Sequence, residues 1–99
     1  MPLNGAVFAT NSGDQSVIWI FSGEAGVLTS VAVESYAFEQ FDPFIEVIAP
    51  DGSSLGREGA TGAGYGTVDN VRLPLGGFYN VRVSTLGSTG RMYGVFVET

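Results

Sequence analysis

The side chains that usually carry enzyme chemistry are largely missing from this sequence. It has no histidine, cysteine or lysine among its 99 residues. These absences exclude Ser-His-Asp and Cys-His triads, Schiff-base lysines, and zinc sites built from histidine or thiolate ligands. The chemistry that remains is a carboxylate pair of the kind that hydrolyses glycosides. The acids that could form one are Glu34, Asp42, Glu46 and Asp69, but no spacing singles out a pair, so we predict that the domain is not an enzyme.

Hard oxygen ligands for a divalent cation are the second chemistry that acidic side chains could supply. The candidates for a calcium site are Asp42, Asp51 and Asp69. No run of alternating acids resembles a dedicated calcium loop. Asp42 and Asp51 also stand next to proline, where aspartate commonly caps a turn. The sequence therefore leaves calcium open, with turn capping and solvation as the alternative, and it predicts no other cofactor.

Charge narrows the choice of partner. Ten acidic side chains and four basic ones, all arginine, give a net charge of -6. A phosphate backbone or an anionic membrane surface would repel such a chain. No stretch approaches the ~20 apolar residues that cross a bilayer. We therefore expect neither nucleic-acid binding nor membrane insertion, and residues 1–10, which lack a basic region and a long apolar run, do not resemble a signal peptide.

The elements that must position these groups are β-strands. Fifteen glycines and four prolines separate short runs rich in Val, Ile, Phe and Tyr, which is the pattern of strands joined by turns. The pattern predicts one all-β domain over residues 1–99, an antiparallel, jelly-roll-like β-sandwich of about eight strands. The predicted strands span 6–10, 15–21, 27–36, 44–49, 54–57, 67–73, 78–85 and 92–98, with a glycine-rich loop over 59–66.

Alternation along the strands assigns the core, because successive side chains of a strand point to opposite faces. We expect Trp19 to be buried between the two sheets, together with its neighbours two residues away. The predicted core consists of Val17, Trp19, Phe21, Val31, Val33, Ile45, Val47, Ala49, Tyr79, Val81, Val83, Tyr93, Val95 and Val97.

The opposite side of the same strands is less polar than a solvated sheet face normally is. It carries Ile18, Ile20, Phe44, Ile48, Phe78, Met92 and Phe96. Apolar residues on neighbouring strands would form a patch, and such patches mark partner surfaces. This pattern predicts an assembly surface. The alternatives are that loops cover these residues, or that a bulge shifts the parity of a strand.

A series of short motifs extends over nearly the whole chain. In order, they are Gly13-Asp14, Trp19 and Phe21, Glu24-Ala25-Gly26, Phe41-Asp42-Pro43, Ile45 and Val47, Ala49-Pro50-Asp51-Gly52, Leu73-Pro74, Gly77-Phe78-Tyr79, Val81 and Val83, Gly90, Tyr93, Val95 and Val97. Their order and spacing resemble the bacterial pre-peptidase C-terminal (PPC) domain family.

That resemblance implies a sandwich domain of secreted bacterial hydrolases, often placed after a protease domain and similar to collagen-binding and polysaccharide-binding modules. Some relatives bind calcium through acidic residues near the N-terminus, where this chain has only Asp14 among its first 23 residues. We therefore expect a non-catalytic accessory module of an exported bacterial protein. It would be extracellular or at the cell surface, and it would target, stabilise or dock a larger protein.

Exposed aromatic residues are the feature that would serve docking on a protein or a polysaccharide. Tyr36, Phe38 and Phe41 fall in a long predicted connection, and Tyr65 falls in the glycine-rich loop, where binding residues commonly sit. The same rings could equally close one end of the sandwich. The alternative function is a structural subunit of a cell-surface or filamentous assembly, in which the partners are copies of the same chain joined through apolar faces or strand edges.

Overall fold

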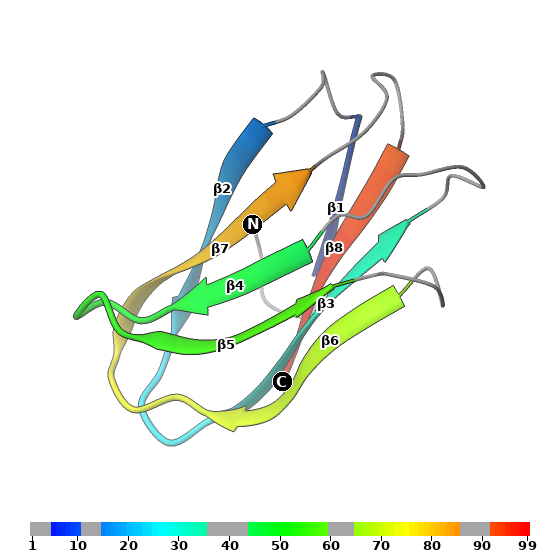
Figure 1. Cartoon of the computed structure of the whole chain (residues 1–99). Coiled ribbons are helices and arrows are strands. Elements are labelled where there is room, and N and C mark those ends of the chain that lie inside the picture. Colours follow the sequence, from blue (N-terminus) through cyan, green and yellow to red (C-terminus); the bar gives the residue numbers. More distant parts are fainter. Residues whose placement is uncertain (1–4, 11–14, 36–43, 60–64, 86–91) are drawn as a thin grey trace.

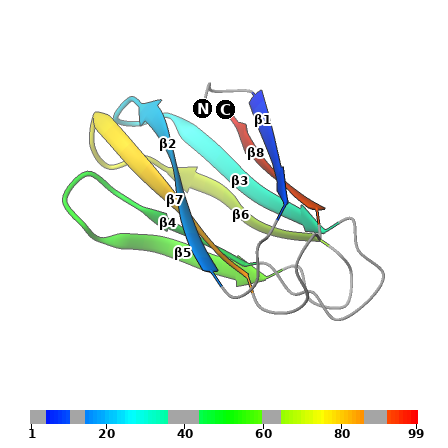
Figure 2. The ribbon, with the colours of Figure 1, turned by 90° about the horizontal axis from the view of Figure 1, so that it is seen from above.

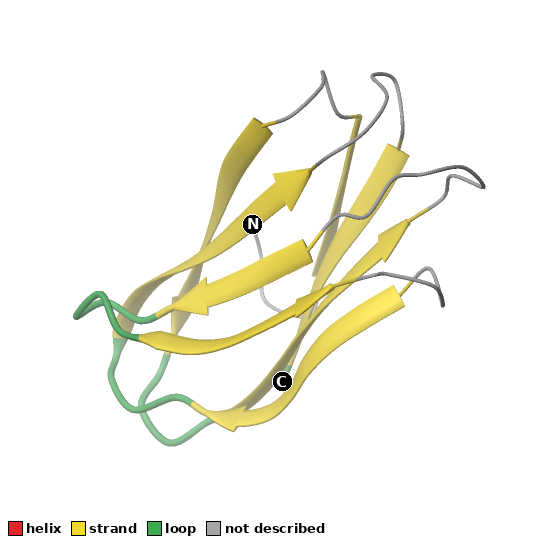
Figure 3. Ribbon diagram, viewed as in Figure 1, coloured by secondary structure: helices red, strands yellow, loops and turns green. Residues whose placement is uncertain are grey.

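The described residues of the chain, 5–10, 15–35, 44–59, 65–85 and 92–99 of a computed structural model, contain strands joined by turns (Figures 1 and 3). The strands are β1 (Gly5–Thr10), β2 (Gln15–Gly23), β3 (Leu28–Ser35), β4 (Phe44–Ile48), β5 (Ser54–Gly59), β6 (Tyr65–Arg72), β7 (Gly77–Thr85) and β8 (Met92–Glu98). All eight predicted strands are present. The main difference is β6, which begins at Tyr65, inside the segment predicted to be a glycine-rich loop.

No helix long and apolar enough to cross a bilayer occurs among the residues that the structure describes.

The strands form two four-stranded antiparallel sheets that pack as two layers (Figure 2). The first has the order β1-β8-β3-β6 and is called the β8 sheet; the second has the order β2-β7-β4-β5 and is called the β7 sheet. Strands equally far from the two chain ends are paired: β1 with β8, β2 with β7, β3 with β6, and β4 with β5. The chain therefore folds back on itself like one long hairpin. The all-β antiparallel sandwich predicted from the sequence is confirmed.

Alternating apolar side chains of both sheets fill the space between the layers. The buried residues are Phe21, Val31, Val33, Ile45, Val47, Ala49, Val68, Leu73, Tyr79, Val81, Val83, Tyr93, Val95 and Val97. The Tyr79 ring stacks on Phe21 with centroids 5.3 Å apart, and its hydroxyl donates a hydrogen bond of 2.5 Å to the Leu75 carbonyl. This contact ties the connection between β6 and β7 to the core.

Trp19 and Val17 are only half-buried, which corrects the prediction that they lie fully inside the core. The reason is their strand: β2 is at the edge of the β7 sheet, so it has a neighbouring strand on one side only. The indole still packs against the core. Burial raises the pKa of the Tyr93 hydroxyl above its ordinary value of 10.0, and the adjacent Trp19 indole partly offsets that increase.

Two connections follow the turn chemistry of the sequence. In the turn between β4 and β5, the Ala49 N–H donates to the Ser53 carbonyl at 2.8 Å, and Asp51 Oδ1 accepts a 3.0 Å hydrogen bond from the Ser53 N–H. Asp51 therefore caps this turn. At the first residue of β7, Gly77 has a φ of 140°, a backbone conformation that residues other than glycine rarely adopt.

Candidate functional site

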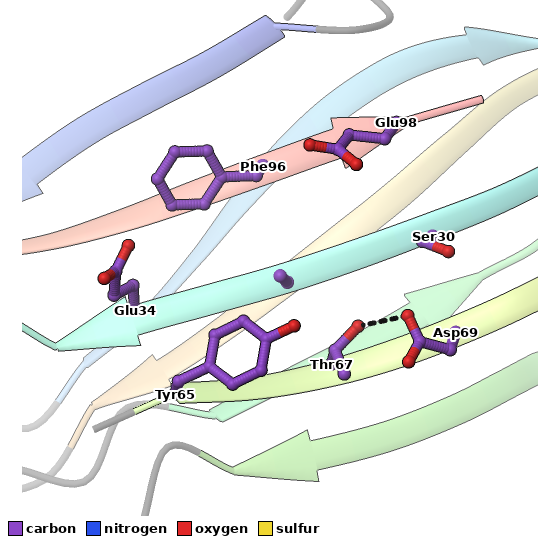
Figure 4. A pocket seen from close by; sticks show the side chains of 8 residues that line it. Ser30, Glu34, Tyr65, Thr67, Asp69, Phe96 and Glu98 are labelled. Atoms are coloured by element: carbon purple, nitrogen blue, oxygen red, sulfur yellow. Dashed lines mark hydrogen bonds between the residues drawn. The ribbon is translucent and has the colours of Figure 1, made fainter. Parts of the chain in front are cut away.

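A shallow hollow of about 260 Å³ lies on the outer face of the β8 sheet (Figure 4). Its walls and floor come from three neighbouring strands, β8, β3 and β6. The lining residues are Ser30, Ala32, Glu34, Tyr65, Thr67, Asp69, Phe96 and Glu98. We call this set of eight residues the acidic groove.

The hollow follows from side-chain size and register. Val31 and Val33 of β3 are buried, so Ser30, Ala32 and Glu34 point outward. Ala32 stands opposite Phe96 of β8 on one side and opposite Thr67 of β6 on the other. The central strand therefore contributes the small side chains of Ser30 and Ala32 to the floor, while the larger side chains of Tyr65 and Phe96 come from the strands on either side.

A bulge places the β6 residues of the groove. The register of β6 against β3 shifts between Thr29 and Val31, and Asn70 has a φ of 52° at that point. As a result Val68 and Val71, three positions apart, both pack on the core, and Asp69 stays on the outer face. Asp69 Oδ1 accepts a hydrogen bond of 2.8 Å from Thr67 Oγ1 (Figure 4).

The groove combines negative charge with aromatic rings. It is lined by three carboxylates and, among the described residues, by no basic side chain. Tyr65 is 53% exposed, and Phe96 makes an edge-to-face contact with Phe8 at 5.8 Å between ring centroids. Carboxylates form bidentate hydrogen bonds with arginine, and aromatic rings stack on guanidinium groups. The groove is therefore suited to hold positively charged side chains.

The predicted binding residues are only partly covered by this description. Tyr65 does line the groove, but it does so from strand β6 rather than from a loop. Tyr36, Phe38 and Phe41 lie outside the described residues. Glu98, Ser30 and Thr67 were not singled out from the sequence. Alternation along the strands places each of these residues on an outer face. Only the strand order, in which β3 lies between β8 and β6, shows that they line one groove.

The calcium candidates are not brought together where the structure describes them. Asp51 caps the turn of the β7 sheet, and Asp69 lies on the outer face of the β8 sheet. Asp42 is outside the described residues, so a calcium site that includes it stays a prediction. Among the described residues, the acidic groove included, no three acidic side chains are placed to hold a metal ion.

The candidate catalytic carboxylates are only partly brought together. Glu34 and Asp69 share the acidic groove, whereas Glu46 lies on the outer face of the other sheet. There its Oε2 accepts a hydrogen bond of 2.9 Å from Ser54 Oγ and lies 4.0 Å from Nε of Arg57.

The predicted assembly residues divide between two faces, which corrects their assignment to one surface. Ile18, Ile20, Phe44, Ile48 and Phe78 lie on the outer face of the β7 sheet, whereas Phe96 and Met92 lie on that of the β8 sheet. The most exposed apolar residues of the β7 sheet are Ile18 (54%), Ile20 (49%) and Phe78 (69%). Phe44 and Ile48 are half-buried, and the Arg57 guanidinium lies 5.4 Å from the Phe44 ring centroid.

Comparison with known proteins gives a likeness among solved structures. No family model matches the chain. No curated protein matches its sequence either. Among solved structures, the chain is similar to Aeromonas hydrophila PliG, described as a periplasmic lysozyme inhibitor of g-type lysozyme. The match has a TM-score of 0.59 and 16% identity, and it covers 94% of this chain and 84% of that one. At this identity the likeness shows a shared fold.

Proposed function

We propose that this domain is a non-catalytic binding module of an exported bacterial protein, and that the acidic groove is the surface that contacts its partner. The observation that carries the proposal is the groove itself, in which three carboxylates and the rings of Tyr65 and Phe96 share one hollow. Such a surface selects a ligand by charge and by stacking.

Binding fits the groove better than catalysis does. Hydrolysis by two carboxyl groups needs contrasting environments, with one carboxyl held in an apolar pocket as the acid. Asp69 and Glu98 are exposed to water, and Glu34 is half-buried, but all three line the same open hollow and none lies in an apolar pocket. The chain also has no histidine, cysteine or lysine to act as a base or nucleophile.

The partner that the groove favours is a protein with a basic segment. Arginine side chains could pair with the carboxylates and stack on the rings at the same time. The fold likeness to PliG supports a protein partner, since that sandwich is described as an inhibitor of a lysozyme. A g-type lysozyme is therefore the first partner to test. A polysaccharide is the alternative, because exposed rings also stack on sugars.

We also propose that the domain is related to the PPC family and has jelly-roll topology. The nested pairing of β1 with β8, β2 with β7, β3 with β6 and β4 with β5 supports this topology, which folds a long hairpin into two sheets. An extracellular or periplasmic location accords with the family resemblance and with the periplasmic description of PliG.

The proposal is tested by measuring binding of the purified domain to a g-type lysozyme, to an arginine-rich peptide and to a soluble polysaccharide. Two double variants remove equal charge: Glu34→Gln with Glu98→Gln inside the groove, and Glu24→Gln with Glu58→Gln at exposed positions outside it. We expect the groove variant to bind the lysozyme and the peptide about tenfold more weakly, as expected for loss of a charge-assisted contact. The control variant should bind like the unmodified domain.

Equal weakening by both variants would contradict the proposal, because it would mean that only net charge matters. Binding of the polysaccharide alone would contradict the choice of a protein partner.

A further inference from the structure

The outer face of the β7 sheet carries a surface whose charge is opposite in sign to that of the acidic groove. Its exposed members are Ile18, Ile20 and Phe78, together with Arg57 and Arg82. We call these five residues the basic apolar face. The acidic groove lies on the other outer surface of the sandwich, so one molecule presents both.

Charge on the basic apolar face is organised in one row across the sheet. Ile18 stands opposite Arg82, Arg82 stands opposite Glu46, and Glu46 stands opposite Arg57. Two guanidinium groups and one carboxylate give this row a net positive charge, in a chain whose net charge is -6. Glu46 is engaged within the face by Ser54 and Arg57.

The acidic groove has the reverse character. Its lining includes Glu34, Asp69 and Glu98 and, within the described part of the chain, no arginine. Arg72 lies at the end of β6, where its guanidinium donates a hydrogen bond of 2.6 Å to the Gly26 carbonyl, and it does not line the groove. Among the described residues, the groove therefore carries three carboxylates, and the row across the β7 sheet carries one net positive charge.

The hollow of the acidic groove leaves room for side chains of a second copy. The groove has small residues, Ser30 and Ala32, on its floor, and its hollow measures about 260 Å³. A hollow of this volume has room for a side chain the size of Ile18, Ile20 or Phe78 of another copy. Sheets that pack face to face interdigitate side chains in this way.

We propose that copies of this chain associate head to tail, with the basic apolar face of one copy seated on the acidic groove of the next. The inference rests on the proposed function, because it assigns a partner to the same groove. A contact between two unlike faces leaves one free face of each kind at the ends, so it can extend into a chain of subunits.

The test uses two variants that each remove one side of the contact. The triple variant Glu34→Gln, Asp69→Asn, Glu98→Gln disables the groove, and the double variant Ile18→Thr, Ile20→Thr disables the basic apolar face while retaining strand propensity.

Sedimentation velocity at increasing concentration should show association of the unmodified domain. Each variant alone should associate about tenfold more weakly, and an equimolar mixture should form a heterodimer, because each variant retains the face that the other lacks. Circular dichroism establishes that both variants are folded.

The triple variant is a stringent test because it lowers the general repulsion between copies. If net charge alone controlled association, removal of three negative charges from a chain of net charge -6 would strengthen association rather than weaken it.

Three results would overturn the inference. The first is an unmodified domain that stays monomeric up to millimolar concentration; if that monomer still binds the lysozyme through the groove, the proposed function stands alone. The second is association that the groove variant retains and the isoleucine variant loses, because this would mean that two like faces pair. The third is a mixture of variants that forms no heterodimer.

Discussion

Thr29 is a polar residue in an apolar part of the core. It is 2% exposed, and within the described part of the chain its hydroxyl has no hydrogen-bond partner. It lies among Phe21, Val71 and Leu73 beside the β6 bulge. A buried hydroxyl without a partner retains the cost of its lost hydration.

Replacing Thr29 by Val should therefore stabilise the domain by about 1 kcal/mol, because the shape is kept and the desolvated hydroxyl is removed. Urea unfolding measures the change. Thr29→Ser is the matched control, since it keeps the hydroxyl and removes a buried methyl group, and it should destabilise. A loss of stability in the Val variant would indicate that the hydroxyl is hydrogen-bonded, for example to a buried water.

Gly23 is confined by the packing of two larger side chains. A Cβ at this position would lie 2.6 Å from Leu73 Cδ1 and 2.9 Å from Tyr79 Cε1. Tyr79 is fully buried and hydrogen-bonded to Leu75, so its ring has little room to move.

We expect Gly23→Ala to destabilise the domain by about 1–3 kcal/mol through overpacking. Gly76→Ala is the control, because a Cβ at Gly76 would meet no atom within 4 Å. Thermal unfolding of the two variants gives the comparison. Equal melting temperatures would contradict the close packing described for Gly23.

At the scale of the elements, the hairpin of β4 and β5 depends on the hydrogen bonds of its turn. The Ser53 hydroxyl and backbone N–H both donate to Asp51 and hold the pKa of its carboxyl below the ordinary value of 3.8. A lowered pKa in the folded state means that the charged carboxylate stabilises the turn. That contribution is present above pH 3.8 and is lost as the pH falls through the lower pKa of the folded state.

Because the side-chain hydrogen bond is the largest cause of this shift, Ser53→Ala should raise the pKa of Asp51 toward 3.8. An NMR titration of the Asp51 carboxyl carbon measures this value in both proteins. An unchanged pKa would assign the shift to backbone N–H groups of the turn and not to the Ser53 hydroxyl.

The strands could be predicted from the sequence because alternation and turn residues coincide in most of them. β6 is the exception: Gly66 occupies an inward position between Tyr65 and Thr67, and a glycine in an inward position leaves no apolar signal. Alternation also failed to show that Val68 and Val71 both face the core, since this requires the bulge at Asn70.

Strand order is what the sequence could not supply. Alternation along β2 shows that Trp19 faces inward, and this led to the prediction that it is fully buried. Alternation does not show that β2 is an edge strand, where an inward side chain is covered on one side only. For the same reason Glu34 and Glu98 were not expected to line one groove: β3 pairs with β8, which places the two carboxylates at opposite ends of the same hollow (Figure 4). The apolar outward residues likewise could not be divided between the two faces without the order of the sheets.

At the scale of the whole molecule, the core between the sheets and the two outer faces of the sandwich have different roles. The space between the sheets carries stability, and the two outer faces carry opposite charge. A polar, open groove on a rigid sheet is well suited to recognition because the strands fix its side chains in position before a partner arrives. The central claim is that this groove is the contact surface.

NMR mapping of backbone amides tests that claim most directly. The labelled domain is titrated with a g-type lysozyme or, in parallel, with an arginine-rich peptide. The account predicts the largest shift or intensity changes at Ala32, Thr67 and Phe96, the central row of the groove, and small changes at Asn80 and Ile48 on the opposite outer face. Changes that are confined to the β7 sheet or to the connections between strands, with the amides of the groove unaffected, would contradict it.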